Sequence, residues 1–172
     1  MNDKVVWITG ASSGIGEATA LRFAKEGWKV AVSARRVELL NKLAENENIY
    51  SYPLDITDTI KIKEVFESII KDLGKIDLCI FSSGTYERKS EKEISVENIK
   101  QVIDVNFLGV INSVSSVEKY FKENKSGHIA IVSSPVGYRG LPKSSGYTPS
   151  KAALNNFTQG IYFDFQKFNV RI

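Results

Sequence analysis

The sequence is poor in the residues that build disulfides, metal clusters and membrane spans. Its 172 residues include one cysteine, Cys79, and one histidine, His128. A lone cysteine excludes an internal disulfide and suits a reducing compartment, and a lone histidine without a second ligand nearby argues against a metal site. No apolar run approaches the roughly 20 residues that cross a bilayer, and residues 1–4 lead into a strand pattern and not into a signal sequence. We therefore expect a soluble cytoplasmic protein with no metal and no membrane partner.

Neither sign of charge dominates the sequence. The 23 lysines and arginines stand against 20 aspartates and glutamates, which leaves a net charge of +3. Because basic and acidic residues are interspersed, they indicate a solvated surface and not the basic stripe of a nucleic-acid-binding protein. The hydrophobic content of 42% and the charged content of 25% are ordinary globular values. This length fits one domain, over residues 1–172, for which we expect no nucleic-acid partner.

Short apolar runs alternate with longer helical patterns along the chain. Runs that are rich in Val and Ile and apolar on both faces predict buried parallel strands at Lys4–Thr9, Lys29–Ser33, Ile49–Pro53, Ile76–Phe81 and His128–Ser133. Helical patterns lie at Gly14–Glu26, Arg36–Glu45, Asp58–Asp72, Val96–Asn124 and Ser150–Phe168. Strict alternation predicts an α/β fold with a doubly wound, Rossmann-like parallel sheet and helices on both faces. The last residues, Asn169–Ile172, read as the start of a sixth strand.

A glycine-rich turn joins the first strand to the first helix. Glycines let the backbone turn tightly and approach a pyrophosphate, while a helix N-terminus offers free N–H groups and a partial positive charge. A glycine-rich turn that follows an apolar strand and opens a helix predicts a dinucleotide site. The residues concerned are Gly10, Ser12, Ser13, Gly14, Ile15 and Gly16.

Tyr147 and Lys151 lie four residues apart at the start of the last helical pattern. Residues at this spacing share one face of a helix. A phenol, with a pKa near 10, transfers protons poorly at neutral pH, but a neighbouring ammonium favours the phenolate. Such a pair suits proton transfer to a carbonyl or from an alcohol. In isolation the spacing is more typical of a solvated helix surface, so the rest of the chain has to decide.

The spacing Gly-x3-Gly-x-Gly at residues 10–16, together with Tyr147-x3-Lys151, resembles the main single-domain branch of the short-chain dehydrogenase/reductase family. The resemblance extends from Val5 to Ile172. Ser134, at a strand end, matches the family serine that hydrogen-bonds the substrate oxygen, whereas Ser133 is the structural neighbour. Asn106 matches the asparagine that holds a water linking the lysine to solvent. Asp55, followed by Ile56, matches the carboxylate that contacts adenine, although the residues alone also allow a helix N-cap there.

Two positions depart from the family pattern. After the fourth strand the family usually has Asn-Asn-Ala-Gly, but this chain has Phe81, Ser82, Ser83 and Gly84. Gly84 still permits close approach to a cofactor, whereas Ser82 lacks the two-ended hydrogen bonding of an amide. We expect Ser82, Ser83 and Gly84 to contact the cofactor with altered sheet stability or cofactor geometry. Pro149 replaces the common alanine and is tolerated in a first helical turn, so the helix should start shortly before it.

The end of the second strand indicates the cofactor. NAD sites commonly place an acid there, but this chain has Arg35 and Arg36 and no acid before Glu38. An acid would repel a 2′-phosphate, which a guanidinium binds in a bidentate manner. The sequence therefore predicts NADP(H) in preference to NAD(H). The alternative is a pair of arginines at the solvent edge of the sheet.

The resemblance implies an oxidoreductase that interconverts a small-molecule carbonyl and a secondary alcohol. Tyr147 passes the proton while hydride moves between the carbonyl carbon and nicotinamide C4. Lys151 lowers the tyrosine pKa and binds the nicotinamide ribose, Ser134 stabilises the oxyanion, and Asn106 supports a water relay. The resemblance also implies a homo-oligomer, dimer or tetramer, built on the two long helices that end near Asn124 and Phe168.

Family members continue for several tens of residues beyond the position of Ile172, so this dinucleotide-binding and catalytic domain is C-terminally incomplete relative to the family. It is either part of a longer protein or a naturally shorter one. A non-catalytic or impaired dinucleotide-binding module therefore stays open as an alternative. The presence of Asn106, Ser134, Tyr147 and Lys151 together favours the enzyme.

Overall fold

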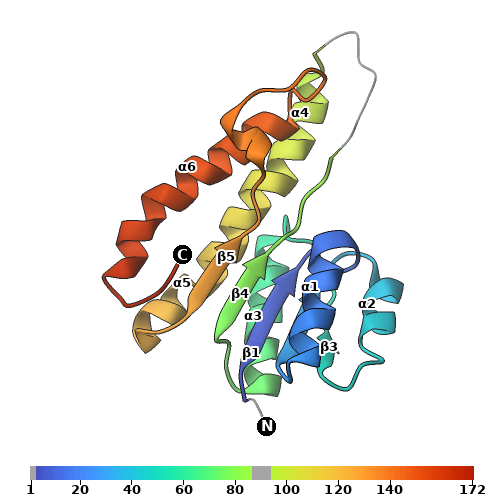
Figure 1. The fold of residues 1–172 in the computed structure, drawn as a ribbon, viewed down its shortest axis with the longest axis vertical. Coiled ribbons are helices and arrows are strands. Elements are labelled where there is room, and N and C mark those ends of the chain that lie inside the picture. Colours follow the sequence, from blue (N-terminus) through green and yellow to red (C-terminus); the bar gives the residue numbers. More distant parts are fainter. Residues whose placement is uncertain (1–2, 87–93) are drawn as a thin grey trace.

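The computed structural model describes residues 3–86 and 94–172 and shows strands and helices in alternation (Figure 1). The strands are β1 (Val5–Thr9), β2 (Lys29–Ser33), β3 (Ile49–Ser51), β4 (Leu78–Phe81) and β5 (His128–Ile131). The α-helices are α1 (Gly14–Lys25), α2 (Val37–Leu43), α3 (Thr59–Leu73), α4 (Val96–Ile103), α5 (Gly109–Asn124) and α6 (Tyr147–Gln166). A π-helical turn, η1 (Asp104–Leu108), joins α4 to α5, and a 3-10 turn, η2 (Pro135–Tyr138), follows β5.

The five strands form one parallel sheet in the order β3-β2-β1-β4-β5. The chain therefore builds outward from β1 in one direction to β3, and then returns to the other side of β1 to add β4 and β5. The order reverses between β1 and β4, where Thr9 pairs with Phe81. In such sheets ligands bind outside the carboxyl ends of the strands at this reversal. The predicted doubly wound α/β fold is confirmed.

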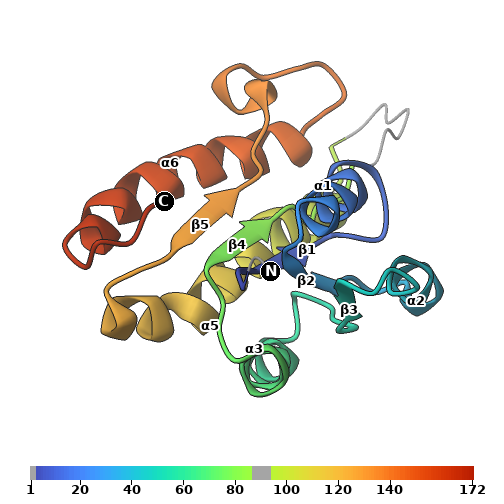
Figure 2. The ribbon, with the colours of Figure 1, turned by 60° about the horizontal axis from the view of Figure 1, so that its bottom comes forward.

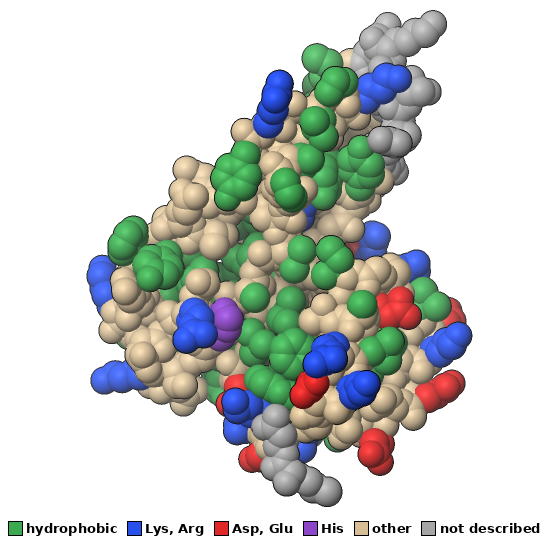
Figure 3. Space-filling view, viewed as in Figure 1, with side chains coloured by type: hydrophobic (Ala, Val, Ile, Leu, Met, Phe, Trp, Pro, Cys, Tyr) green, Lys and Arg blue, Asp and Glu red, His purple; other side chains and the backbone are tan. Residues whose placement is uncertain are grey.

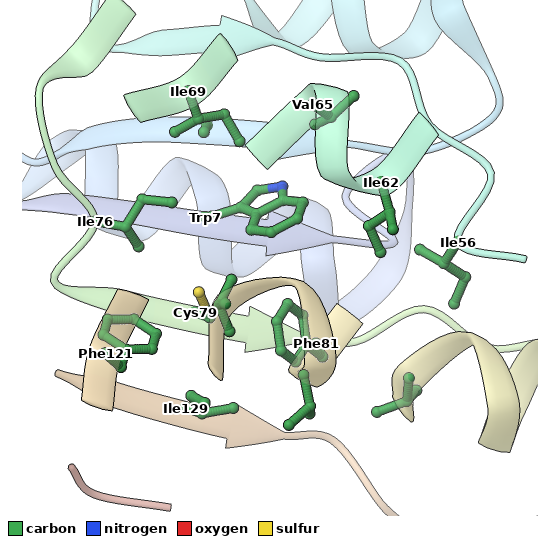
Figure 4. Close-up of a cluster of buried hydrophobic side chains, with 14 of the residues drawn as sticks. Trp7, Ile56, Ile62, Val65, Ile69, Ile76, Cys79, Phe81, Phe121 and Ile129 are labelled. Carbon is green, nitrogen blue, oxygen red and sulfur yellow. The ribbon is translucent and has the colours of Figure 1, made fainter. Parts of the chain in front are cut away.

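Alternate residues of β1 explain how both faces of the sheet are covered. Val5 and Trp7 pack with side chains of α3 and α5, while Val6 and Ile8 pack with those of α1 and α2. Figure 2 shows the sheet almost edge-on, with α1 on one side and α3 and α5 on the other. On the α3 side, Trp7 meets Phe81 edge to face, with ring centroids 5.8 Å apart, among buried aliphatic side chains (Figure 4).

The long helix predicted over Val96–Asn124 is not one continuous α-helix. Residues Asp104–Leu108 form a π-turn within it. A π-helical turn holds one residue more than an α-helical turn, and such turns are rare and frequent at functional sites. In this turn the buried side chain of Asn106 bonds to the backbone of Thr85, which follows β4.

Two other boundaries also differ from the prediction. The fifth strand ends at Ile131, before Ser133, and just beyond it the Lys151 ammonium donates to the Val132 carbonyl oxygen at 2.9 Å, which ties this part of the chain to α6. Helix α6 begins at Tyr147, earlier than Ser150, and Pro149 lies in its first turn as expected.

The predicted start of a sixth strand is confirmed at the end of the chain. Arg171 lies beside His128 in a parallel bridge. The Ile129 N–H donates to the Arg171 carbonyl oxygen at 2.9 Å, and the Arg171 N–H donates to the Gly127 carbonyl oxygen at 3.0 Å.

In the described parts of the chain, no helix is both long and apolar enough to cross a membrane.

Candidate functional site

A cleft of about 320 Å³ opens at the carboxyl ends of the strands, where the strand order reverses. It is bounded by the loops that follow β1, β2 and β4 and by the segment that follows β3. Its lining residues are Gly10, Ser12, Ser13, Ile15, Gly16, Ala34, Arg35, Arg36, Leu54, Asp55, Ile56, Ser82, Ser83, Gly84 and Val105. Most of the residues predicted to bind a cofactor therefore lie around one cavity.

The glycine-rich turn packs directly on the loop after β4. Gly10 has a φ of 70°, and a Cβ there would lie 2.7 Å from the Cα of Ser83, so only glycine fits this position. Helix α1 begins at Gly14, and the preceding Ser13 makes no side-chain cap to it. Because a helix leaves its first N–H groups unpaired, this end of α1 is available to an anion.

Arg36 reaches from the end of β2 onto the same turn. Its guanidinium donates to the Ser12 hydroxyl at 2.9 and 3.1 Å and to the Ser13 hydroxyl at 2.6 Å. Arg35 also lines the cleft, and it pairs only loosely with Asp55, at 4.0 Å between largely exposed groups. Two guanidinium groups thus stand at the end of the cleft next to two serine hydroxyls.

Asp55 lies on the cleft, but it does not cap a helix. Its carboxylate accepts from the Thr57 N–H at 3.0 Å and from the Thr57 hydroxyl at 2.8 Å. The N-cap of α3 is Asp58, which accepts from the N–H groups of Ile60 and Lys61. The helix-cap interpretation of Asp55 is therefore wrong, and its carboxylate remains beside the cavity.

Ser82 uses its single hydroxyl within the protein. The hydroxyl donates to the Thr9 carbonyl oxygen at 2.7 Å and so joins the ends of β4 and β1. The Thr9 hydroxyl, by contrast, is completely buried and has no hydrogen-bond partner among the described residues. An amide at position 82 would carry its N–H donors and its carbonyl acceptor on separate atoms, so that it could bond to the Thr9 carbonyl and the Thr9 hydroxyl at once, whereas serine has a single oxygen with one proton to donate.

Asn106 fastens three segments together. Its amide oxygen accepts from the Thr85 N–H at 2.7 Å, and its amide nitrogen donates to the Thr85 carbonyl at 2.9 Å. The same nitrogen donates to the Ser150 hydroxyl at 3.2 Å. The side chain is completely buried, so it ties η1 to the chain after β4 and to the first turn of α6.

Tyr147 and Lys151 lie one turn apart on α6, with the Lys151 Nζ 5.7 Å from the centroid of the tyrosine ring. Lys151 is 5% exposed, and this burial lowers its pKa below the usual value of 10.5. Its Nζ lies 3.8 Å from the point that a Cβ on Gly84 would occupy. The ammonium therefore faces the loop that closes the cleft, and Gly84 leaves room for it.

The predicted serine pair lies between β5 and α6. The Ser134 hydroxyl accepts from the Val136 N–H at 3.4 Å at the start of η2. Ser133 donates to the Lys151 carbonyl at 3.2 Å, which is a structural bond. A Cβ on Gly137 would lie 2.9 Å from the Lys151 carbonyl oxygen, so η2 packs closely on the helix turn that carries the lysine.

Several residues of this region are not evident from the sequence pattern. Ser150 stands next to Lys151, and Ala34 and Leu54 flank predicted residues, so their proximity could have signalled them. Val105 likewise stands next to the predicted Asn106, whereas Tyr86 carries no such signal. The ring of Tyr86 meets that of Tyr147 edge to face, with centroids 4.7 Å apart and an interplanar angle of 72°.

Comparison with known proteins adds relatives for the whole chain. A family model for short chain dehydrogenase matches residues 4–172. The chain is similar to dehydrogenase/reductase SDR family member 7 of Mus musculus, with 33% identity over 98% of this chain and 52% of the mouse protein. It is also similar to the 3-oxoacyl-(acyl-carrier-protein) reductase FabG of Thermotoga maritima, with 35% identity over 100% of this chain and 72% of that protein. The chain spans about half the length of the mouse relative and of its human counterpart.

Solved structures with a bound cofactor share the fold. ElxO with NADP bound matches 98% of this chain and 71% of its own, with a TM-score of 0.92 and 28% identity. A variant of the actinorhodin polyketide ketoreductase with NADPH matches 97% of this chain and 67% of its own, with a TM-score of 0.90 and 26% identity. The match of the family model over residues 4–172 and these shared structures lead to one conclusion: the chain belongs to the short-chain dehydrogenase family.

Proposed function

We propose that residues 1–172 form the dinucleotide-binding and catalytic domain of an NADP(H)-dependent oxidoreductase that interconverts a small-molecule carbonyl and a secondary alcohol. The observation that carries this proposal is the meeting of three side chains near Gly84. Lys151 lies beside Gly84 and beside the ring of Tyr147, and Asn106 joins the adjacent Thr85 to the first turn of α6. Proton transfer to a reacting oxygen requires such a fixed group at the edge of a cofactor cleft.

The described residues fit a dinucleotide. The uncapped start of α1, formed by Gly14, Ile15 and Gly16, would hold the pyrophosphate, and a Cβ on Gly14 would meet nothing within 4 Å. Asp55 and Ile56 would contact the adenine, while the chain at 82–84 would lie against the nicotinamide half. Tyr147 and Lys151 would face the nicotinamide ribose.

Arg36 supports NADP(H) in preference to NAD(H). Its guanidinium already lies among the Ser12 and Ser13 hydroxyls, and together these groups present several donors to a 2′-phosphate. Arg35 would add a second positive charge at the same end of the cleft. The structures of ElxO with NADP and of the polyketide ketoreductase with NADPH support this choice by analogy.

When bound, the nicotinamide would supply the hydride in reduction and accept it in oxidation, and the chain's own residues would handle the proton. Tyr147 donates its phenolic proton to the substrate oxygen in reduction and accepts it in oxidation. The Lys151 ammonium stabilises the phenolate that forms, and the Ser134 hydroxyl donates to the substrate oxygen as charge develops on it. Asn106 fixes the position of the chain after β4 relative to the start of α6. It would also support a water relay that returns the proton to the active site.

Turnover tests this proposal directly. NADPH absorbance should fall in the presence of some members of a panel of ketones and aldehydes, and Tyr147→Phe should abolish the loss while leaving NADPH binding intact. Binding without turnover would favour a non-catalytic dinucleotide-binding module. Near wild-type turnover by Tyr147→Phe would remove the tyrosine from the chemistry.

Cofactor choice is tested by titrating both dinucleotides into the wild type and into Arg36→Ala. We expect NADPH to bind more tightly than NADH and the variant to lose most of that preference, since it loses the charged donor nearest the serines. Glu38→Ala is the matched control, because it also removes a charge at the start of α2 but from a residue that does not line the cleft. Equal or tighter binding of NADH by the wild type would contradict the NADP(H) assignment.

Of the two long helices expected to build an oligomer, those that end near Asn124 and Phe168, the exposed surface of α6 supports self-association as a dimer or tetramer. Tyr162 and Phe163 on α6 are 41% and 66% exposed, and Figure 3 shows hydrophobic side chains along this side of the molecule. The two rings contact each other, with centroids 5.2 Å apart, and contiguous exposed apolar side chains favour an interaction surface more than single ones do. Phe163→Glu should shift the mass measured by light scattering toward the monomer, and an unchanged mass would exclude this surface.

A further inference from the structure

Tyr86 contacts the proposed acid/base residue, Tyr147, although it has no role in the proton transfer described above. Its ring packs edge to face on the ring of Tyr147, with centroids 4.7 Å apart and planes at 72°. This separation lies at the close end of the range for favourable aromatic pairs, about 4.5–7 Å. Tyr86 is 49% exposed, so its ring is not part of the hydrophobic core, and its contact with Tyr147 lies at the surface of the site.

The backbone that carries Tyr86 is fixed just before it. Asn106 binds both the N–H and the carbonyl oxygen of Thr85, at 2.7 and 2.9 Å. Asn106 itself is completely buried. Since Tyr86 is the next residue, its Cα has little freedom to move relative to η1. The position from which the Tyr86 ring contacts Tyr147 is therefore restrained as well.

The same asparagine also reaches the backbone of Tyr147. It donates to the Ser150 hydroxyl at 3.2 Å, and that hydroxyl donates in turn to the Tyr147 carbonyl oxygen at 2.7 Å. Asn106 therefore holds Tyr147 in two ways: at the backbone through Ser150, and at the ring through Thr85 and Tyr86. A ring restrained only at its backbone can still rotate about its side-chain bonds, and the second contact opposes that rotation.

We propose that Tyr86 is a positioning residue, whose ring holds the phenol of Tyr147 in the orientation needed for proton transfer. The inference rests on the proposed function for its kinetic consequence, but the contact itself has a separate physical readout. Proton transfer depends steeply on geometry, since a misplacement of about 1 Å can cost about 100-fold in rate. The aromatic ring of Tyr86 is the feature that matters, and its hydroxyl is not.

Three variants separate these roles in kinetics. Tyr86→Phe keeps the ring and should retain kcat within about twofold, whereas Tyr86→Leu removes it and should lower kcat between about tenfold and 100-fold with the KM for NADPH unchanged. Tyr138→Leu is the matched control, because Tyr138 is 80% exposed and makes no ring contact with Tyr147; it should leave kcat unchanged. Equal kcat values in Tyr86→Leu and wild type would overturn the proposal, as would an equal loss in Tyr86→Phe.

NMR signals of the Tyr147 ring test whether Tyr86 restrains it, and this test does not require that the chain turn over a substrate. In protein labelled with carbon-13 tyrosine, the Tyr147 signals are identified by their loss in Tyr147→Phe. Tyr86→Leu should shift these signals and raise the ring-flip rate of Tyr147, and Tyr86→Phe should leave the flip rate near that of the wild type. If no carbonyl were reduced by the wild type, the proposed function would fail while this result would still stand. Unchanged Tyr147 signals in Tyr86→Leu would refute the positioning role.

Discussion

Thr9→Val should stabilise the protein, although it removes a polar group from the carboxyl end of β1. Thr9 ends β1 and is completely buried, and its hydroxyl has no hydrogen-bond partner within the described residues. Its carbonyl oxygen, in contrast, accepts the Ser82 hydroxyl. Valine has the same branched shape and a strong preference for strands, so the substitution leaves no cavity and keeps the backbone contact.

The expected gain follows from the cost of the unpaired hydroxyl. A buried donor without a partner costs about 1–3 kcal/mol, and the added methyl group suffers some crowding because threonine and valine are not fully isosteric. We therefore expect the free energy of unfolding to rise by about 1–2 kcal/mol. For a chain of this size, that gain corresponds to an increase in Tm of roughly 2–8 °C.

Urea unfolding at equilibrium measures the change, with an unchanged m-value as the sign that the folded and unfolded states keep their compactness. Thr148→Val is the matched control. Thr148 is also buried, but its hydroxyl donates to the Ser144 carbonyl oxygen at 2.9 Å, so this variant should lose about 1 kcal/mol. A loss of stability in Thr9→Val similar to that in Thr148→Val would show that the Thr9 hydroxyl is paired and would refute the reasoning.

Position 82 offers a second test of the same bond. The family usually has asparagine here, and its amide can bond to both the carbonyl and the hydroxyl of Thr9. In a Ser82→Asn background, Thr9→Val should therefore lose its stabilising effect, giving a coupling energy of about 1 kcal/mol in a double-mutant cycle. Additive effects of the two substitutions would mean that the Thr9 hydroxyl does not reach position 82.

Two further predictions concern pH and rest on groups whose charge is disfavoured by the fold. Burial and the neighbouring Arg171 charge lower the pKa of His128 below 6.5, so the unfolded chain takes up the proton first. Stability should be full above about pH 6.5 and should fall as the pH drops through the folded-state pKa, and His128→Gln should lose this dependence in urea unfolding across the acidic range. Burial likewise lowers the pKa of Lys151, so stability should rise with pH between the folded-state pKa and 10.5. Lys151→Met should remove this rise in urea unfolding between neutral and alkaline pH while losing turnover, and an unchanged pH dependence in the variant would contradict the stated cost of the buried ammonium.

The sequence pattern predicts the elements of this fold well because their causes are local. The strands need only apolar runs, and the turn after β1 needs only its glycines, so residues 10–16 are found without knowledge of the rest of the structure. The positions of Arg35 and Arg36 follow in the same way from the end of β2. In a parallel sheet the loops after neighbouring strands lie at the same edge, so the residues after β1, β2 and β4 meet around one cleft.

The remaining features depend on bonds between segments that are far apart in the chain, and no local pattern contains them. The π-turn forms where Asn106 binds the backbone of Thr85, 21 residues away. The apolar pattern of residues 96–124 predicts a continuous α-helix because it contains no sign of this bond. The contact of Tyr86 with Tyr147 joins residues that the pattern treats as unrelated, and it depends on the same asparagine through Thr85. One buried amide thus decides both where the long helix is distorted and how the proposed acid/base residue is held. For this reason Asn106→Asp, which keeps the size but removes the donor to Ser150 and to the Thr85 carbonyl, should disturb the Tyr147 ring signals more than Ser150→Ala, which breaks only the link through Ser150.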